Sequence, residues 1–489
     1  MQRLLSDEWA WPRGSLDQLL KAALFPDDKA ALGNLIQWLD RHDIDSATFR
    51  EHRLLATISN RFGKDISDHR AYPRLRGLRR QLWTKSQIAI REAGPVLKAI
   101  ANAGVPLLLI KGAARIARDR SAEKGRVAHD IDIVVGPDRI HDAFAILEGC
   151  GWQPSSGASS CYLATQLDAN QSLNFFSGSF GDIDLHRDAF PSIRDEVDEE
   201  RLWQAADFAN FLGIDVRVPS ASYTAALAIA HGSLAAHIHS DWVVDCVYAI
   251  GSREFSWPAF SQILDRRRLE VPTSILFSYL SRQIGIDIPS DILRQVAESA
   301  NKYGPVSRMG YLLQAKPRDD MPKSLHIARW VAKKTRLRHE RASRDSRFRQ
   351  PVFRGKRRLT RLPAKPASSS QYSTSHAIEL STNGLRDEPM FVSILIEMEA
   401  PPKSRRIELE VNSKSGHIAR LRYRYLLNFG GPVVLKFDGA ARFNSADHFA
   451  TIEARPIRQI RKWEDKETAL RFGAIPFRLI SFELSRSNT

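Results

Sequence analysis

The sequence predicts an α+β protein that has a small mixed α/β core, helical regions on both sides of it and an all-β, sandwich-like C-terminal domain. Three observations lead to this prediction. Apolar residues recur every three or four positions before about residue 100 and again after about residue 195. Between these regions, short apolar runs surround one helical segment. After about residue 375, short runs rich in β-branched and aromatic residues are separated by Asn, Gly, Pro and Ser.

Length and composition limit the class of protein. A chain of 489 residues exceeds a single compact core, so several domains are expected. No run approaches 18 apolar residues, and the N-terminus lacks the apolar stretch of a secretory signal, so we expect no membrane span. Cys150, Cys161 and Cys246 provide neither a disulfide framework nor a zinc spacing. We therefore expect a cytoplasmic protein.

The predicted domains follow these changes in composition. They are a helical N-terminal region (1–100), an α/β core (101–195), a helical domain (196–335), a basic Pro/Ser-rich linker (336–375) and an all-β domain (376–489). The net charge is +16, and most of it lies between Lys333 and Lys365, where fourteen lysines and arginines face two acidic residues. This segment is interpreted either as a solvated tether or as an arm for an anionic partner.

Local patterns predict the elements of the core in order. The stretch "QLWTKSQIAIREAGPVLKAIANAG" predicts a helix that stops near Ala103-Gly104. The run "VPLLLIKGAA" predicts a short buried strand, and "RIHDAFAILEGCGW" predicts a helix. The segment "SLNFFSGSFGDIDLHRD" predicts two strands around a Gly-rich turn, and "SYTAALAIAHGSLAAHI" and "DWVVDCVYAIGS" predict helices of the next region.

Paired aspartates occur on two of the predicted strands. In "HDIDIVV", Asp130 and Asp132 share one face of a strand, because side chains two residues apart point the same way. In "GDIDLHRD", Asp182 and Asp184 have the same relation. A third copy of the pattern, at residues 42–45, lacks the apolar run and predicts a loop that leads into a helix. Carboxylates crowded at the edge of a core repel each other, and a divalent cation such as Mg²⁺ usually relieves this repulsion.

Such carboxylates suit phosphoryl or nucleotidyl transfer. These reactions use metal ions, often a pair about 4 Å apart, to hold phosphates and neutralise charge. Asp130 and Asp132 would provide a carboxylate doublet, and Asp184 or Asp182 would provide a third carboxylate. A glycine-containing turn ahead of the acidic strand allows backbone to approach phosphates, and the turn that contains Lys111 occupies that position.

The motifs "LLLIKGAA", an arginine, "HDIDIVV" and "GDIDLHRD" together resemble the DNA polymerase beta-type nucleotidyltransferase superfamily. More narrowly, the chain is similar to a large, poorly characterised bacterial nucleotidyltransferase family. The resemblance covers roughly residues 90–255. It implies that Lys111 and Gly112 lie in the nucleotide-side turn, that Asp130 and Asp132 are the metal pair, and that Asp184 is the third carboxylate. The turn departs from the Gly-Ser of well-studied superfamily members.

The resemblance implies a metal-dependent nucleotidyltransferase with a polymerase beta-like core. It would transfer NMP from an NTP to a hydroxyl or phosphate of an unidentified acceptor, which could be a small molecule, a glycan, a protein or RNA. Mg²⁺ or Mn²⁺ would be the cofactor. The expected catalytic and metal-binding residues are Asp130, Asp132 and Asp184, and the nucleotide-binding residues are Lys111, Gly112 and Arg126.

Two other functions stay open, and several residues have a structural interpretation. The chain could be a catalytically inactive binding protein that keeps the fold, or an RNA-directed enzyme that uses the basic linker. Lys111 could be a surface lysine at a strand end, and Arg126 could pair with a structural acid. His186, and also His231 and Asp245, which match a helical pattern of the family, are more readily explained by packing than by catalysis.

Overall fold

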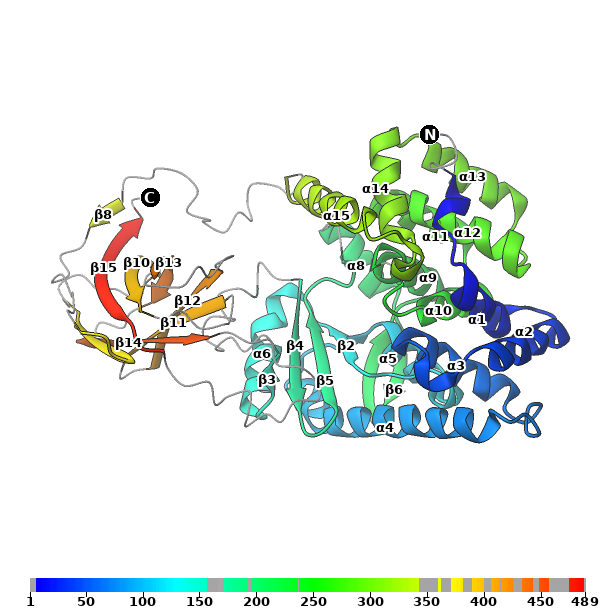
Figure 1. Cartoon of the computed structure of the whole chain (residues 1–489), viewed down its shortest axis with the longest axis horizontal. Helices are drawn as coiled ribbons and strands as arrows, with labels where there is room; N and C mark the ends of the chain where they lie inside the picture. The colour runs from blue at the N-terminus through cyan, green and yellow to red at the C-terminus, as the bar shows by residue number, and fades with distance from the viewer. Residues whose placement is uncertain are drawn as a thin grey trace. The chain divides into compact units, whose positions relative to one another are not determined.

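The computed structural model describes residues 6–155, 167, 171–191, 195–235, 237–342, 359–361, 371–380, 389–399, 406–413, 416–424, 433–442, 448–456 and 475–487 (Figure 1). The chain divides into two compact units. The first comprises residues 1–150 and 177–348, and the second comprises residues 151–176 and 349–489.

The first unit begins with helices whose apolar residues are spaced for burial on one side. Helix α3 starts at a capping box, in which the Thr48 side chain accepts from the backbone N–H of Glu51 and the Glu51 side chain accepts from that of Thr48. The long helix α4 ends beside Gly104, as its sequence predicts. The helices are η2 (Asp7–Ala10), α1 (Gly14–Leu24), α2 (Asp28–Arg41), η3 (Ile44–Ser46), α3 (Phe49–Phe62) and α4 (Tyr72–Asn102).

A seven-stranded mixed sheet follows, with the order β3-β4-β5-β2-β1-β7-β6; β3 and nearly all of β4 belong to residues 151–176. Strand β2 is antiparallel to β1 and parallel to β5, and β1 is parallel to β7. Helix α4 runs along the sheet and contacts β2, β5 and β7 (Figure 1). The strands are β1 (Leu108–Leu109), β2 (Ile131–Val134), β3 (Gln153–Pro154), β4 (Ser172–Ser177), β5 (Gly181–His186), β6 (Asp207–Phe211) and β7 (Ile214–Val218).

Helices fill the connections of the sheet and the chain after it. Those within the core are α5 (Lys111–Arg118), η4 (Arg120–Lys124), η5 (Pro137–Arg139) and α6 (Ile140–Gly149). Those that follow are α8 (Glu196–Gln204), α9 (Ala221–Gly232), η6 (Ser233–Ala235), α10 (Asp241–Ile250), α11 (Trp257–Arg267), α12 (Glu270–Tyr279), η7 (Leu280–Ile284), α13 (Ser290–Asn301), α14 (Pro305–Ala315), η8 (Arg318–Asp320) and α15 (Leu325–Ala342).

The N-terminal helices and the later helices share one hydrophobic core. Trp38 of α2, Phe260 of α11 and Tyr279 of α12 belong to the same buried cluster. The polar ends of two of these side chains form hydrogen bonds, and that of Tyr279 joins the two helical regions. The Trp38 indole donates to Ser15 Oγ (2.8 Å), and the Tyr279 hydroxyl donates to an Asp17 carboxylate oxygen (2.8 Å). The two predicted helical regions therefore stabilise each other although the sheet separates them in sequence.

The second unit contains two four-stranded sheets, β13-β10-β15-β8 and β12-β11-β14-β9. Alternate residues of both sheets enter one buried cluster, as Ile394 of β10 and Leu409 of β11 illustrate. This arrangement confirms the predicted α+β class with a sandwich-like C-terminal region. The strands are β8 (Leu359–Arg361), β9 (Ser375–Glu379), β10 (Pro389–Met398), β11 (Arg406–Ser413), β12 (Gly416–Arg424), β13 (Val433–Arg442), β14 (Phe449–Pro456) and β15 (Arg478–Ser487).

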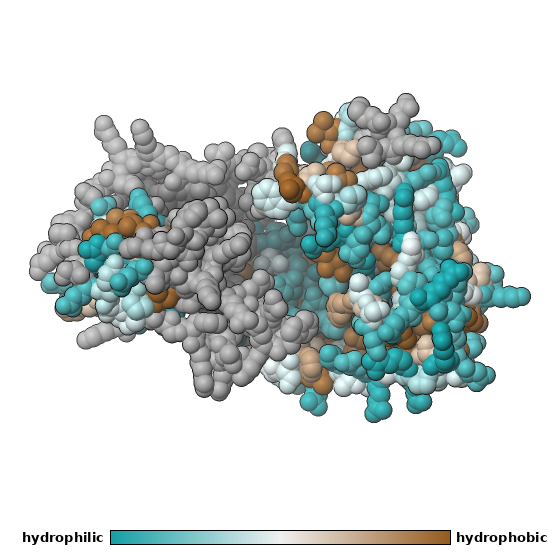
Figure 2. Space-filling model, in the orientation of Figure 1, coloured by the Kyte–Doolittle hydropathy of each residue, from teal (hydrophilic) through white to brown (hydrophobic). Residues whose placement is uncertain are grey.

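The domain boundaries drawn from the sequence stay predictions, and two of them fall on described elements. Strands β6 and β7 lie beyond the boundary at residue 195 but belong to the core sheet. The predicted linker (336–375) begins inside α15 and includes β8, while residues 343–358 and 362–370 lie outside the described part of the chain. No helix in the described ranges is long and apolar enough to span a membrane. The visible face of the first unit is mostly hydrophilic with scattered hydrophobic residues (Figure 2).

Candidate active site

The parallel pairing of β2 with β5 brings two of the predicted aspartates together. Asp132 lies opposite Asp184 in the register, and Val134 lies opposite His186. His186 Nε2 is 3.0 Å from Asp132 Oδ1 and 3.0 Å from Asp184 Oδ2. One ligand atom from each of Asp132, Asp184 and His186 lies within 4.8 Å of the others. We call these three residues the acidic cluster.

Lys111 joins the acidic cluster from the turn between β1 and α5. The backbone N–H of Ile110 donates to the Asp132 carbonyl (3.1 Å), so the next residue emerges beside the Asp132 side chain. Lys111 Nζ donates to Asp132 Oδ1 at 2.5 Å. Its φ of +55° is unusual for a residue with a side chain, and backbone strain of this kind is concentrated at functional sites.

Charge explains how the acidic cluster is stabilised. Burial lowers the pKa of the Lys111 ammonium, but the charges of Asp132, Asp130 and Asp184 outweigh it and raise that pKa above its ordinary value. Burial also lowers the pKa of His186, but Asp184 and the hydrogen bonds to both carboxylates raise it to about 9. Two cationic groups therefore lie among the three aspartates that the sequence singles out as catalytic.

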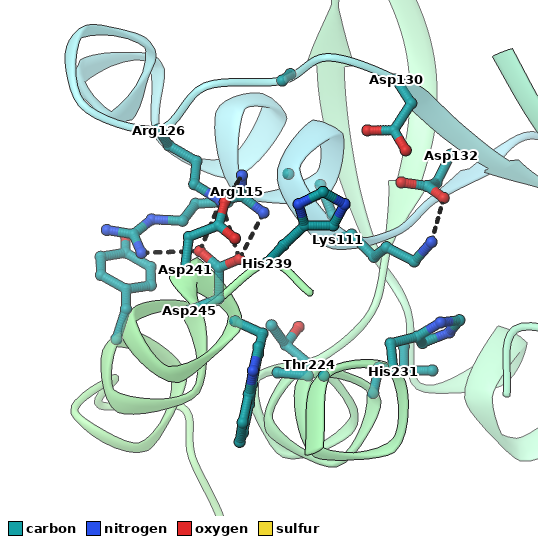
Figure 3. A pocket seen from close by; sticks show the side chains of 18 of the residues that line it. Lys111, Arg115, Arg126, Asp130, Asp132, Thr224, His231, His239, Asp241 and Asp245 are labelled. Atoms are coloured by element: carbon teal, nitrogen blue, oxygen red, sulfur yellow. Dashed lines mark hydrogen bonds and ion pairs between the residues drawn. The ribbon is translucent and has the colours of Figure 1, made fainter. Parts of the chain in front are cut away.

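Asp130 and Asp182 occupy different positions around this cluster. Asp130 directly precedes β2, is half-buried and lines the same pocket as Asp132 (Figure 3). Asp182 is buried on β5, two residues before Asp184, and is not one of the three residues grouped above. Between the two candidates for the third carboxylate, the geometry favours Asp184.

Gly112 and Arg126 lie against each other at the start of α5. A Cβ atom at Gly112 would come within 3.2–3.3 Å of the Arg126 guanidinium, so the glycine makes room for this group. The guanidinium binds Asp245 (Nη2 to Oδ2, 2.9 Å) and also forms an ion pair with Asp241. Arg126 therefore makes the acid pair that the sequence left open as an alternative to phosphate contact.

Three residues of this network escape prediction from the sequence. Arg53 of α3 pairs with Asp241 (Nη2 to Oδ2, 2.5 Å), and Arg115 of α5 pairs with Asp245 (Nη1 to Oδ1, 3.0 Å). Burial raises the pKa of Asp241, but the two neighbouring arginines hold it well below its usual range. The only available sequence signal is the spacing of Asp241 and Asp245, which places both on one face of a helix. Their partners are remote in sequence and carry no such signal.

The pocket beside the acidic cluster lies between α5, α9 and α10 and has a volume of about 1100 Å³ including its open mouth. Lys111, Asp130 and Asp132 lie toward one end of it, and the acids of α10 lie toward the other (Figure 3). Leu227 and Trp242 contribute apolar walls.

His231 of α9 also lines this pocket, but its imidazole forms a hydrogen bond with a backbone carbonyl. Its Nε2 donates to the carbonyl of Ala189 (2.7 Å). Burial, followed by the positive charges of Lys111 and His186, lowers the pKa of His231 well below 6.5. A neutral His231 thus links α9 to the segment after β5 through this hydrogen bond. This contact agrees with the structural interpretation of His231 from the sequence.

The donor set of the acidic cluster fits a divalent cation. Carboxylate oxygens suit both Mg²⁺ and Mn²⁺. In this structure the Lys111 ammonium supplies the positive charge beside Asp132. Asp132 and Asp184, with Asp130 nearby, would hold the metal, and the pocket along α5 is open to a second molecule.

The family described as uncharacterised nucleotidyltransferase matches residues 35–284, just over half of the chain, which confirms the similarity to a poorly characterised nucleotidyltransferase family. Among solved structures, the chain is similar to the solution structure of the antibiotic-resistance factor ANT(2'')-Ia. The sequence identity is 15%, the TM-score is 0.23, and the match covers 44% of this chain and 95% of that one. No curated protein matches this chain.

Proposed function

The chain belongs to the uncharacterised nucleotidyltransferase family, and from this premise we propose that it transfers NMP from an NTP to an acceptor in a reaction that depends on Mg²⁺ or Mn²⁺. The observation that carries the proposal is the acidic cluster beside the start of α5. It combines two aspartates, in register on parallel strands, with His186 between them, and the half-buried Lys111 donates to Asp132. A bound metal would neutralise phosphate charge and align the reacting oxygens.

Residues around the cluster take distinct roles in this proposal. Asp132 and Asp184, with Asp130, hold the metal. Lys111, whose side chain lines the pocket, would contact the phosphates, and a bound metal would supply the positive charge that Lys111 gives to Asp132 in this structure. Gly112 lets the nucleotide approach the start of α5. Arg126 positions this turn through Asp241 and Asp245.

The chemistry requires an acceptor oxygen to bond to the α-phosphorus while the bond to the β-phosphate oxygen breaks. Pyrophosphate leaves, and the proton of a hydroxyl acceptor passes to Asp184, whose carboxylate lies beside Asp132 on the neighbouring strand, while an ionised phosphate acceptor has no proton to transfer. The acceptor carries a hydroxyl or a phosphate, and we place the reaction in the cytoplasm. The acceptor could be a small molecule, a glycan, a protein or RNA.

The test compares labels at two positions of the nucleotide. Purified protein is incubated with a cell extract, Mg²⁺ and each NTP, labelled either at the α- or at the γ-phosphate. The proposal predicts a new product that carries the α-label but not the γ-label. An Asp184→Asn variant should lower its yield by about a hundredfold or more, since the loss of several kcal/mol of charge stabilisation costs tenfold per 1.36 kcal/mol.

Asp215→Asn is the matched control, because Asp215 is an exposed aspartate on β7 of the same sheet and does not line the pocket. It should leave the yield unchanged. A product that carries the γ-label instead would identify a kinase and refute the proposal.

A further inference from the structure

Helix α15 exposes an apolar face. Ile327, Trp330 and Val331 have exposed fractions of 73%, 62% and 48%. Their spacing of three and four residues places them side by side on one face of the helix. Large apolar side chains gathered in this way, unlike single exposed ones, indicate a surface that binds something.

The opposite side of α15 is fixed to the first unit. Arg329 Nη2 donates to the carbonyl oxygens of Gln314 (2.7 Å) and Lys316 (3.1 Å) at the end of α14. Ala332 lies close to Gly310, where a Cβ would meet its side chain at 3.8 Å. These contacts set the rotation of the helix, so the apolar face is presented outward by the fold.

The charge of α15 points to an anionic partner. Its 18 residues contain six lysines and arginines and one glutamate. The sequence that follows α15, residues 343–365, adds nine lysines and arginines and one aspartate, a net charge of +8. A surface that binds this segment should therefore combine an apolar layer with negative charge.

We propose that the apolar face of α15 docks on an anionic lipid surface, to which the positive charge of this part of the chain attracts it. A bilayer interface offers acyl chains for Ile327, Trp330 and Val331 and phosphates for the cations. Nucleic acid offers phosphates but no apolar layer. A protein groove that encloses an amphipathic helix contacts the helix on several sides. One side of α15 is already in contact with α14. A flat interface needs only one face.

This proposal goes beyond NMP transfer, because lipid binding requires neither nucleotide nor an intact acidic cluster. The experiment is flotation of the full-length protein with vesicles of phosphatidylcholine alone or mixed with phosphatidylglycerol. We expect the protein to float with the mixed vesicles only, and to dissociate as salt is raised. Equal binding to both vesicles, or none to either, would overturn the proposal.

Two variants distinguish binding through this face from non-specific binding through any exposed apolar side chain. Ile327→Ser combined with Trp330→Ser should weaken binding to the mixed vesicles by at least tenfold. Phe208→Ser is the control, because Phe208 of β6 is equally exposed (75%) but lies outside α15. It should bind as the unchanged protein does. Circular dichroism checks that each variant is folded, and undiminished binding by a folded double variant would refute the assignment of the surface.

Discussion

Arg126 lies at the centre of a buried ionic network that joins three helices to the loop before β2. It contacts Asp241 and Asp245 of α10, which also bind Arg53 of α3 and Arg115 of α5. Removing buried charges from water is costly, and only close mutual pairing offsets that cost. Every residue of the network is therefore important for the stability of the fold, because the loss of a partner leaves an uncompensated buried charge.

We predict that Arg126→Ala destabilises the first unit by about 3–5 kcal/mol, since two buried carboxylates lose a partner. Arg126→Lys should lie between this variant and the unchanged protein, because an ammonium cannot bind both carboxylates as the planar guanidinium does. Thermal unfolding followed by circular dichroism measures the effect. Arg139→Ala removes a more exposed pair with Asp142 and should cost at most about 1 kcal/mol. Equal effects at the two positions would contradict the account.

The individual residues of the site were predictable to unequal degrees. Asp132 and Asp184 follow from the alternation of acidic and apolar residues, which assigns both to strands. The position of His186 between the two carboxylates could not be predicted, because it depends on the pairing of β2 with β5. Asp241 and Arg53 could not be predicted, because their pairing depends on how α3 and α10 meet in space.

At the scale of elements, short strands determine the site. Strand β2 has four residues, and its pairing with β5 places Asp132 opposite Asp184. A shift of one residue would turn Asp132 toward the other face of the sheet. The buried residues Ile131, Ile133 and Val134 stabilise the observed register. The sequence predicted these strands, but not that β6 and β7 continue the sheet, because the surrounding pattern is helical.

The segment between η6 and α10 contains a buried histidine. His237 is 5% exposed, its φ is +52°, and its carbonyl accepts from Arg50 Nη1 (3.2 Å). Burial, and secondarily the charges of Arg50 and Arg329, lower the pKa of His237 to about 3. The unfolded chain has a histidine pKa of about 6.5. Between these values only the unfolded chain binds the proton, so the free energy of unfolding falls as the pH decreases from 6.5 toward 3.

We predict that His237→Asn removes this part of the pH dependence. Asparagine does not titrate there and tolerates a positive φ. Between pH 7 and pH 5, the unchanged protein should lose roughly 2 kcal/mol more stability than the variant does. Thermal unfolding across this range measures the difference. His141→Asn, at an exposed histidine of α6, is the control for the same substitution outside this segment. Parallel profiles for His237→Asn and the unchanged protein would refute the prediction.

At the scale of the whole molecule, two hydrophobic cores correspond to the two units. One is built from helices that precede and follow the core sheet, and the other is shared by the two sheets of the β-rich region. The sequence predicted the change from helical to β-rich texture. It could not predict that the two helical regions share one core, because their contacts, such as Trp11 with Ser278 (3.2 Å), join residues hundreds of positions apart.

Limited proteolysis tests whether the β-rich region folds by itself. The sequence between α15 and β8, residues 343–358, is dense in arginine and has few apolar residues, so we expect trypsin to cut there first. Two stable fragments should result. The C-terminal fragment should retain a β-type circular dichroism spectrum, because its sheets bury their own core. A C-terminal fragment that is unfolded, or first cuts within the described strands, would contradict this prediction.

The central claim is that Asp132 and Asp184 hold a divalent metal on which nucleotide binding depends. Electron paramagnetic resonance of Mn²⁺ in the presence of an NTP measures this most directly, because free and protein-bound Mn²⁺ give different signals. We predict tight Mn²⁺ binding by the unchanged protein and by Asp215→Asn, and a loss of at least about tenfold in affinity for folded Asp132→Asn. Binding that is undiminished in Asp132→Asn, or absent from the unchanged protein, would contradict the claim.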